Sequence, residues 1–258
     1  MEVLQIDITG KLAHFRKYYA NNTAMSFSIP PRTTVIGMLA GILGRPRDTY
    51  YEEFGSDRIR IGMSVLTPLK KTFHRLNMLS VKGKGDLNGS GGRIQTPFEV
   101  VSGFDISRDL VTYRVFVSCT DSGVDTFEAL KMALSLREHR FALTFGTANF
   151  TASVSAFSIY KRADIQEITP IGWVSIHSVV PSRFIEKIDF DPDRSPDSME
   201  MIEEELLPAD FVANQNRELK KMVRALFSTS SKEMRLQLNS PYYRLSAGED
   251  NQHIVFIE

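Results

Sequence analysis

Four consecutive residues near the start of the chain combine a histidine, an aromatic ring and two cations. They are His14, Phe15, Arg16 and Lys17, which follow an alternating apolar segment at 3–8. A pair of cations beside an aromatic ring can hold a phosphate and stack a base, as proteins do with single-stranded RNA. A surface loop with long basic side chains fits the same pattern, so the four residues alone leave both interpretations open.

A second basic group lies in the segment 70–95. It contains six cations against one acid, Asp86, together with His74 and five glycines. The cations are Lys70, Lys71, Arg75, Lys82, Lys84 and Arg93. Hydrophobic residues flank the segment on both sides, which predicts a long hairpin that leaves a sheet and ends in a mobile basic tip. Such a projection can follow a phosphate backbone, although a basic loop without a specific partner has the same composition.

Enzyme signatures are missing from the sequence. It contains no phosphate-binding loop, HExxH, Gly-x-Ser-x-Gly or dinucleotide fingerprint, and no two of the five histidines have metal-ligand spacing. The single cysteine, Cys119, excludes an intrachain disulfide and a cysteine-rich zinc site. We therefore predict no catalytic residue, no metal and no cofactor.

The elements that would position the basic groups follow in a regular order. Apolar patterns predict strands at 3–8, 59–66, 110–119, 140–145 and 153–160, and helices at 35–43 and 126–136. The first helix is expected to have Thr33 or Thr34 as its N-cap and to end at Gly44. Asp125 is the expected N-cap of the second helix. The order is strand, helix, strand, hairpin, strand, helix, strand, which matches a ferredoxin-like or RRM-like βαββαβ unit.

The fold class predicted for the whole chain is α+β. A ferredoxin-like palm covers residues 1–160, with a hairpin thumb at about 67–100, and a smaller β-rich part covers 161–258. In that second part the patterns predict strands at 173–180, 235–238 and 253–257, and a helix at 218–227. Ten acids between residues 186 and 210 predict a solvated loop and helix face.

Composition is that of an ordinary globular protein. The 31 basic and 31 acidic residues cancel, so the net charge does not by itself indicate a nucleic-acid partner. No apolar run is long enough to span a membrane, and the first residues do not have the pattern of a signal peptide. A cytoplasmic protein without membrane contact is the expectation.

Two motifs resemble the N-terminal signature of CRISPR-associated protein family five. The first runs Gly10-Lys11-Leu12-Ala13-His14-Phe15-Arg16, and the second runs Ser28-Ile29-Pro30-Pro31-Arg32-Thr33-Thr34-Val35-Ile36-Gly37-Met38-Leu39. The family pattern is a strand that ends in glycine, then Ala-x-Phe-Arg and Pro-Pro-x-Thr-Thr-Val-x-Gly-Met-Leu. The resemblance covers about the first 45 residues. Beyond them it rests on the layout, with the basic hairpin at the place of the family's thumb.

The resemblance implies a specific role. Members of the family have an RRM-like palm and a hairpin thumb, and they cap the 5′ handle of the CRISPR RNA in a type I (Cascade) effector complex for antiviral defence. They contact the large subunit and a backbone subunit, and target DNA only indirectly. The RNA-binding residues it implies here are His14, Phe15, Arg16, Lys17, Arg32, Thr33, Thr34, Lys70, Lys71, His74, Arg75, Lys82, Lys84 and Arg93.

Two other functions are compatible with the same fold. In the type I-C branch of the family the protein cleaves precursor RNA without metal, using a tyrosine, a lysine and a histidine, and this sequence contains Tyr50, Tyr51, Lys71 and His74. The Pro-Pro-x-Thr-Thr motif is more similar to type I-B members, which are scaffolds, so we predict a non-catalytic subunit. A protein-interaction module without RNA is the other alternative.

Overall fold

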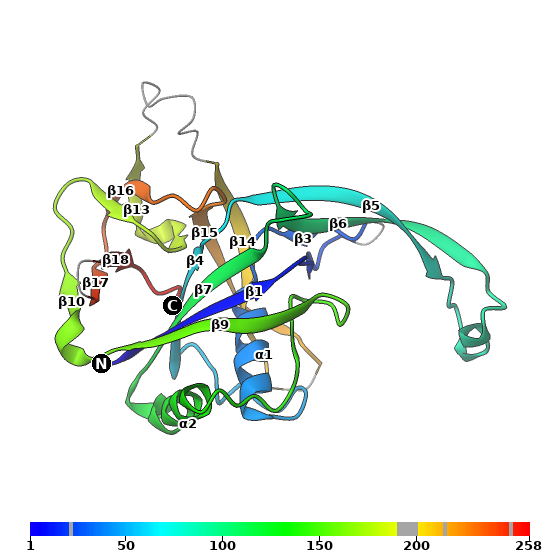
Figure 1. Cartoon of the computed structure of the whole chain (residues 1–258), viewed down its shortest axis with the longest axis horizontal. Helices are drawn as coiled ribbons and strands as arrows, with labels where there is room; N and C mark the ends of the chain where they lie inside the picture. Colours follow the sequence, from blue (N-terminus) through cyan, green and yellow to red (C-terminus); the bar gives the residue numbers. More distant parts are fainter. Residues whose placement is uncertain (21–22, 190–200, 214–215, 248–249) are drawn as a thin grey trace.

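The computed structural model describes residues 1–20, 23–189, 201–213, 216–247 and 250–258. It is a mixed α/β structure made mostly of strands, and a five-stranded antiparallel sheet lies at its centre (Figure 1). The sheet order is β4 (Ile59–Val65), β7 (Val111–Cys119), β1 (Val3–Gly10), β9 (Thr151–Tyr160) and β8 (Leu143–Thr144). Helices α1 (Arg32–Leu43) and α2 (Val124–Ser135) lie on the same side of it (Figure 1).

The element order predicted for residues 3–160 is the order found. β1 has neighbours on both edges, with Ile6 opposite Val115 of β7 and Phe157 of β9. Because both edges are paired and both faces are covered, almost every residue of β1 is buried. Two short strands, β2 (Phe15–Arg16) and β3 (Ser26–Phe27), pair with each other between β1 and α1.

The helix starts differ from the predicted caps. Pro31, and not Thr33 or Thr34, is the N-cap of α1, and Gly123, and not Asp125, is the N-cap of α2. Pro31 is extended, with a ψ of 155°, and helical geometry begins at Arg32. Thr33 and Thr34 therefore lie inside the first turn and cannot be its N-cap. The predicted end at Gly44 is confirmed, since its φ of 71° is left-handed and its N–H bonds the carbonyls of Ala40 and Gly41.

The basic segment forms the predicted hairpin, which we call the thumb (residues 69–103). Strands β5 (Leu69–Leu79) and β6 (Arg93–Gly103) pair over their whole length, and a short 3-10 turn, Lys84–Asn88, lies at the tip. Figure 1 shows the two strands leaving the body of the molecule as a free ribbon. Only the base, with Leu69 and the end of β6, is buried.

The residues described after 164 form three small antiparallel sheets. Their orders are β10-β17-β18, β11-β16-β13 and β12-β15-β14. The strands are β10 (Ile165–Ile168), β11 (Val174–Ile176), β12 (Val180–Pro181), β13 (Ile185–Ile188), β14 (Ile202–Phe211), β15 (Leu219–Ser228), β16 (Met234–Leu238), β17 (Tyr242–Ala247) and β18 (Asp250–Ile254).

Two predictions in this region are wrong. Residues 218–227 form strand β15 and not a helix, because the segment pairs with β14, with Val223 opposite Leu207. The acidic segment is not a loop and helix face where the structure describes it, since its two ends are strands β13 and β14. Residues 190–200 of that segment lie outside the described residues.

The largest apolar cluster draws on both halves of the chain. It joins Ile6 and Leu39 to Leu207, Val223 and Phe227. The predicted division at residue 160 therefore crosses a shared core, and the boundary itself stays a prediction.

Candidate nucleic-acid interface

The thumb presents its cations to solvent. Lys70, Arg75, Lys82, Lys84 and Arg93 are exposed, and within the described part of the chain none of them forms an ion pair. The carboxylate of Asp86, the one acid of the segment 70–95, accepts hydrogen bonds from the backbone N–H groups of Lys82 and Gly83 at 2.8 and 2.9 Å. Asp86 thus shapes the tip, and its side chain leaves the cations unpaired.

Large apolar side chains lie among these cations. Phe73 is 58% exposed, and Leu76, Met78, Leu79 and Ile94 are exposed as well. Directly opposed residues of an antiparallel pair share a face, so Arg93 lies beside Leu79. Phe73 and Arg75 lie on the same face as this pair, which therefore offers cations for phosphates and apolar surface for bases.

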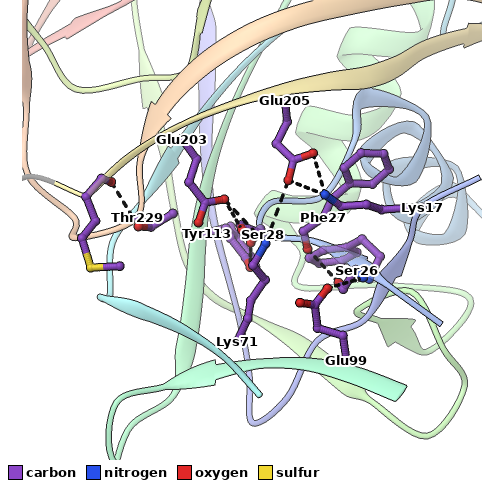
Figure 2. A network of polar contacts seen from close by, with 12 residues as sticks. Lys17, Ser26, Phe27, Ser28, Lys71, Glu99, Tyr113, Glu203, Glu205 and Thr229 are labelled. Atoms are coloured by element: carbon purple, nitrogen blue, oxygen red, sulfur yellow. Dashed lines mark hydrogen bonds and ion pairs between the residues drawn. The ribbon is translucent and has the colours of Figure 1, made fainter. Parts of the chain in front are cut away.

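At the base of the thumb two cations already have partners. The Nζ atom of Lys17 lies 2.7 and 2.9 Å from the carboxylate oxygens of Glu205, and that of Lys71 lies 3.8 Å from Glu203 and 4.0 Å from Glu205. Figure 2 shows how these acids of β14 face the thumb, and how Ser28 donates to Glu203 at 2.5 Å. Two acids that the sequence assigned to a solvated face thus neutralise two of the predicted RNA-binding cations.

Strand pairing separates the residues of the 14–17 group. Phe15 and Lys17 point inward and are buried, while Arg16 points outward and is exposed. His14 is buried too: its ring stacks on Phe98 with 3.9 Å between centroids, and its Nδ1 lies 2.7 Å from the Glu99 carbonyl. Burial lowers the pKa of His14, so the ring is neutral at pH 7. Of the four, only Arg16 is left on the surface.

Two tyrosines beside Arg16 were missed by the sequence analysis. Tyr18 and Tyr19 are 50% and 54% exposed, and their rings meet edge to face with 5.1 Å between centroids. The sequence did contain a signal for including them in the RNA-binding set: two adjacent aromatic residues continue a cationic segment and precede a polar loop.

Arg32 must be removed from the predicted RNA-binding set. Its side chain is 1% exposed, and its guanidinium pairs with Asp210 at 2.6 Å and Glu258 at 2.5 Å. It also donates to the carbonyl oxygens of Phe54 and Ile59, at 2.9 and 2.7 Å. A guanidinium with all of its donors engaged in the interior holds α1 to three other segments and cannot reach a phosphate.

Thr33 and Thr34 keep partial exposure at the start of α1. They line a cavity of about 330 Å³ together with Tyr50, Tyr51 and Arg217. The charge of Arg217 is balanced by Asp48, with 2.9 Å between Nε and Oδ1.

Comparisons with known proteins agree with this architecture. A family model described as CRISPR-associated protein (Cas_Cas5) matches residues 3–170. The chain belongs to the CRISPR-associated Cas5 family. No curated protein matches the sequence.

Two solved structures are similar to this Cas5 chain in fold. The first is described as a CRISPR protein from Archaeoglobus fulgidus, with a TM-score of 0.57 at 15% identity, covering 99% of this chain and 100% of that one. The second is a chain of a CRISPR RNA-guided surveillance complex, with a TM-score of 0.51 at 11% identity, covering 90% and 91%.

The residues of the nuclease alternative lie in two places in this Cas5 protein. Tyr50 and Tyr51 line the cavity at α1, which neither Lys71 nor His74 lines, since both belong to β5. Burial and a hydrogen bond to Asp48 raise the pKa of Tyr51 to about 12. A phenol with that pKa is protonated at neutral pH and is a poor general base.

The described residues show neither a metal-binding cluster nor a membrane-spanning helix. No group of three His, Cys, Asp or Glu side chains there could hold a metal ion. No helix among them is long and apolar enough to cross a membrane.

Proposed function

We propose that this protein is a non-catalytic subunit of a type I CRISPR effector complex and binds the 5′ handle of the CRISPR RNA. The observation that carries the proposal is the thumb, which projects from the body with unpaired cations and exposed apolar side chains along it. Family membership supports the effector role.

The strand order supports the palm that we propose for the fold. β4-β7-β1-β9, with one helix after β1 and another after β7, is the arrangement expected of a ferredoxin-like or RRM-like unit. The Pro-Pro-x-Thr-Thr motif supports a type I-B-like member. We place the backbone and large subunits of the complex as its protein partners, and target DNA as an indirect one.

The proposed RNA-binding set follows exposure. The set keeps the residues with exposed or partly exposed side chains, which are Arg16, Thr33, Thr34, Lys70, His74, Arg75, Lys82, Lys84 and Arg93. It adds Tyr18, Tyr19 and Phe73 as stacking surfaces. Lys71 stays in the set as a weaker contact, because acids lie beside it. The set leaves out His14, Phe15, Lys17 and Arg32, which are buried.

The first test uses a labelled CRISPR repeat RNA with the purified protein in EDTA, analysed on native and denaturing gels from one tube. A shifted but intact RNA is expected. Discrete cleavage would make the protein a metal-independent endoribonuclease, and absence of a shift would contradict direct handle binding.

Charge variants locate the contact. Lys82→Ala/Lys84→Ala/Arg93→Ala should weaken binding and reduce the slope of log K against log salt by about 2, because each phosphate contact to a single strand contributes about 0.7. The matched control is Arg162→Ala/Arg183→Ala/Lys187→Ala, which removes three exposed cations away from the thumb. An equal loss in both variants would show that net charge, and not the thumb, determines binding.

A further inference from the structure

The outer edge of β9 has free backbone hydrogen-bonding groups. One side of β9 pairs with β1, and its other side pairs with β8 only at Thr151 and Ala152. Over Ser153–Ile159 no strand in the described part of the chain takes the outer side. Figure 1 shows β9 along the margin of the central sheet.

This edge has one of the features that protect an edge strand, a bulge at Ser155 opposite Asp7 and Ile8, and lacks most of the others. Thr151–Tyr160 contains no charged residue, no proline and no glycine, and it is rich in β-branched, aromatic and small side chains. Exposed edges are normally short, charged or covered, because an unprotected edge pairs with other chains.

A cavity lies next to the unpaired edge. It has a volume of about 310 Å³, and its wall includes Val154, Ala156 and Phe157 of β9 together with Ile42 of α1 and Leu134 of α2. The cavity is partly apolar and partly polar, since serines and charged residues line it as well. A strand edge beside such a cavity is the arrangement by which folded domains take up extended peptides: the backbone gives affinity and the cavity selects a side chain.

The charged end of the cavity specifies the partner further. Arg137, Glu138 and His139, which follow α2, complete its wall, and Arg140 comes next in the chain. All four are exposed, and none of them has an ion pair with any described residue. Arg137, whose exposed guanidinium lines the cavity without an ion pair to any described residue, offers a partner for an acidic side chain on the ligand.

We propose that β9 binds an extended segment of a partner protein. The segment adds a strand next to Ser153–Ile159, places an apolar side chain in the cavity and an Asp or Glu opposite Arg137. This docking site is separate from the thumb and goes beyond the proposed RNA binding. RNA does not fit, because the edge carries no cation and RNA has no row of alternating amide donors and acceptors.

A second copy of the chain fits the edge less well. Antiparallel pairing of two β9 strands about a two-fold axis would place α2 of both copies, and the Arg137 that follows each, on the same face of the joined sheet. Like charges at short range disfavour that arrangement, whereas an acidic segment relieves it.

The test screens random octapeptides displayed on phage against the whole protein. We expect the selected peptides to share a consensus with alternating apolar residues and one Asp or Glu. A synthetic consensus peptide should bind, should slow amide exchange at Ser153–Ile159, and should lose about tenfold or more in affinity when alternate backbone nitrogens are methylated. N-methylation keeps every side chain and leaves the protein unchanged, so protein misfolding cannot mimic the result.

A charge swap checks the acidic position. Arg137→Glu should weaken the consensus peptide and, in a new screen, select Lys or Arg in place of Asp or Glu, while Lys187→Glu, on another sheet, should change neither. Four results would overturn the proposal: no consensus, equal binding of the methylated peptide, protection elsewhere, or a peptide-free dimer with Ser153–Ile159 already protected.

Discussion

At the residue scale, Arg32 determines how the start of α1 is fixed. Removing the guanidinium leaves the buried carboxylates of Asp210 and Glu258 without their partner. Arg32→Met should lower the free energy of unfolding by about 3 to 5 kcal/mol, measured by urea titration. Arg108→Met, at an exposed ion pair with Asp105, should cost under about 1 kcal/mol. Similar costs for the two would contradict the buried role.

His14 gives a second prediction at this scale, on pH. Burial lowers its folded-state pKa, so the unfolded chain takes up the proton first as the pH falls. The stability that neutral His14 contributes is therefore present above about pH 6.5, its pKa in the unfolded chain. That stability is lost as the pH falls through the lower pKa of the folded protein. Between about pH 7.5 and 5.5, wild type should lose more stability than His14→Phe, which keeps an aromatic ring against Phe98.

Some pH dependence should remain in that variant. Burial also lowers the pKa of His177, which lies 3.4 Å from Glu233 and stays in place. Chemical denaturation of wild type and His14→Phe at the two pH values separates the contribution of His14 from that of His177. If the loss of stability between the two pH values were the same in both proteins, His14 would not be buried as a neutral ring.

At the scale of elements, β14 supplies acidic partners to two cations, at different distances. Glu205 is the close partner of buried Lys17; although burial opposes it, the hydrogen bonds and charge of Glu205 raise the pKa of that amine. Glu203 faces half-exposed Lys71 at 3.8 Å. Of these two acids on β14, Glu205 therefore holds a buried ammonium, whereas Glu203 lies near a more exposed one.

Glu205→Gln should destabilise the fold by about 2 to 4 kcal/mol, since it leaves a buried ammonium unpaired. Glu203→Gln should cost about 1 kcal/mol or less and should raise affinity for repeat RNA a few fold, because it removes a negative charge beside the thumb. Urea titration and a binding isotherm at fixed salt measure the two effects. Unchanged RNA affinity in Glu203→Gln would remove Lys71 from the interface.

Elements with a strong local pattern were predictable from sequence, and those decided by pairing were not. The apolar run of α1 and the flanked basic hairpin each have one consistent solution. Residues 218–227 fit helical spacing and also alternation, and the partner strand β14 decided between them.

The same reason limits prediction of the site. Exposed thumb cations could be inferred from composition, because six cations and five glycines stand against one acid between residues 70 and 95. The burial of His14 and Lys17 depends on contacts with Glu99 and Glu205, which are 85 and 188 residues away along the chain. No local pattern carries that information.

At the scale of the whole molecule, neutrality conceals a separation of charge. The segment 70–95 holds six of the 31 basic residues and one of the 31 acids, so the other residues, 25 basic and 30 acidic, have a net charge of −5. The field at the thumb is therefore positive while that of the body is negative on average.

Shortening the thumb tests this separation. Replacing Met78–Ile94 with Asn-Gly joins the pair Asn77 and Gln95 through a two-residue turn and removes no buried residue. The free energy of unfolding should stay within about 1 kcal/mol of wild type, while affinity for repeat RNA should fall tenfold or more, as an order of magnitude. Retained affinity in a folded variant would place the RNA on the body.

The Arg32 cluster also bears on how the protein is made. Arg32 and its partner Glu258 are separated by 226 residues. At about 5 to 20 residues per second, a ribosome needs roughly 10 to 45 s to cover that distance. During that time the first helix has been synthesised but the carboxylate of Glu258 has not, so the nascent chain cannot complete this buried ion-pair cluster until Glu258 emerges.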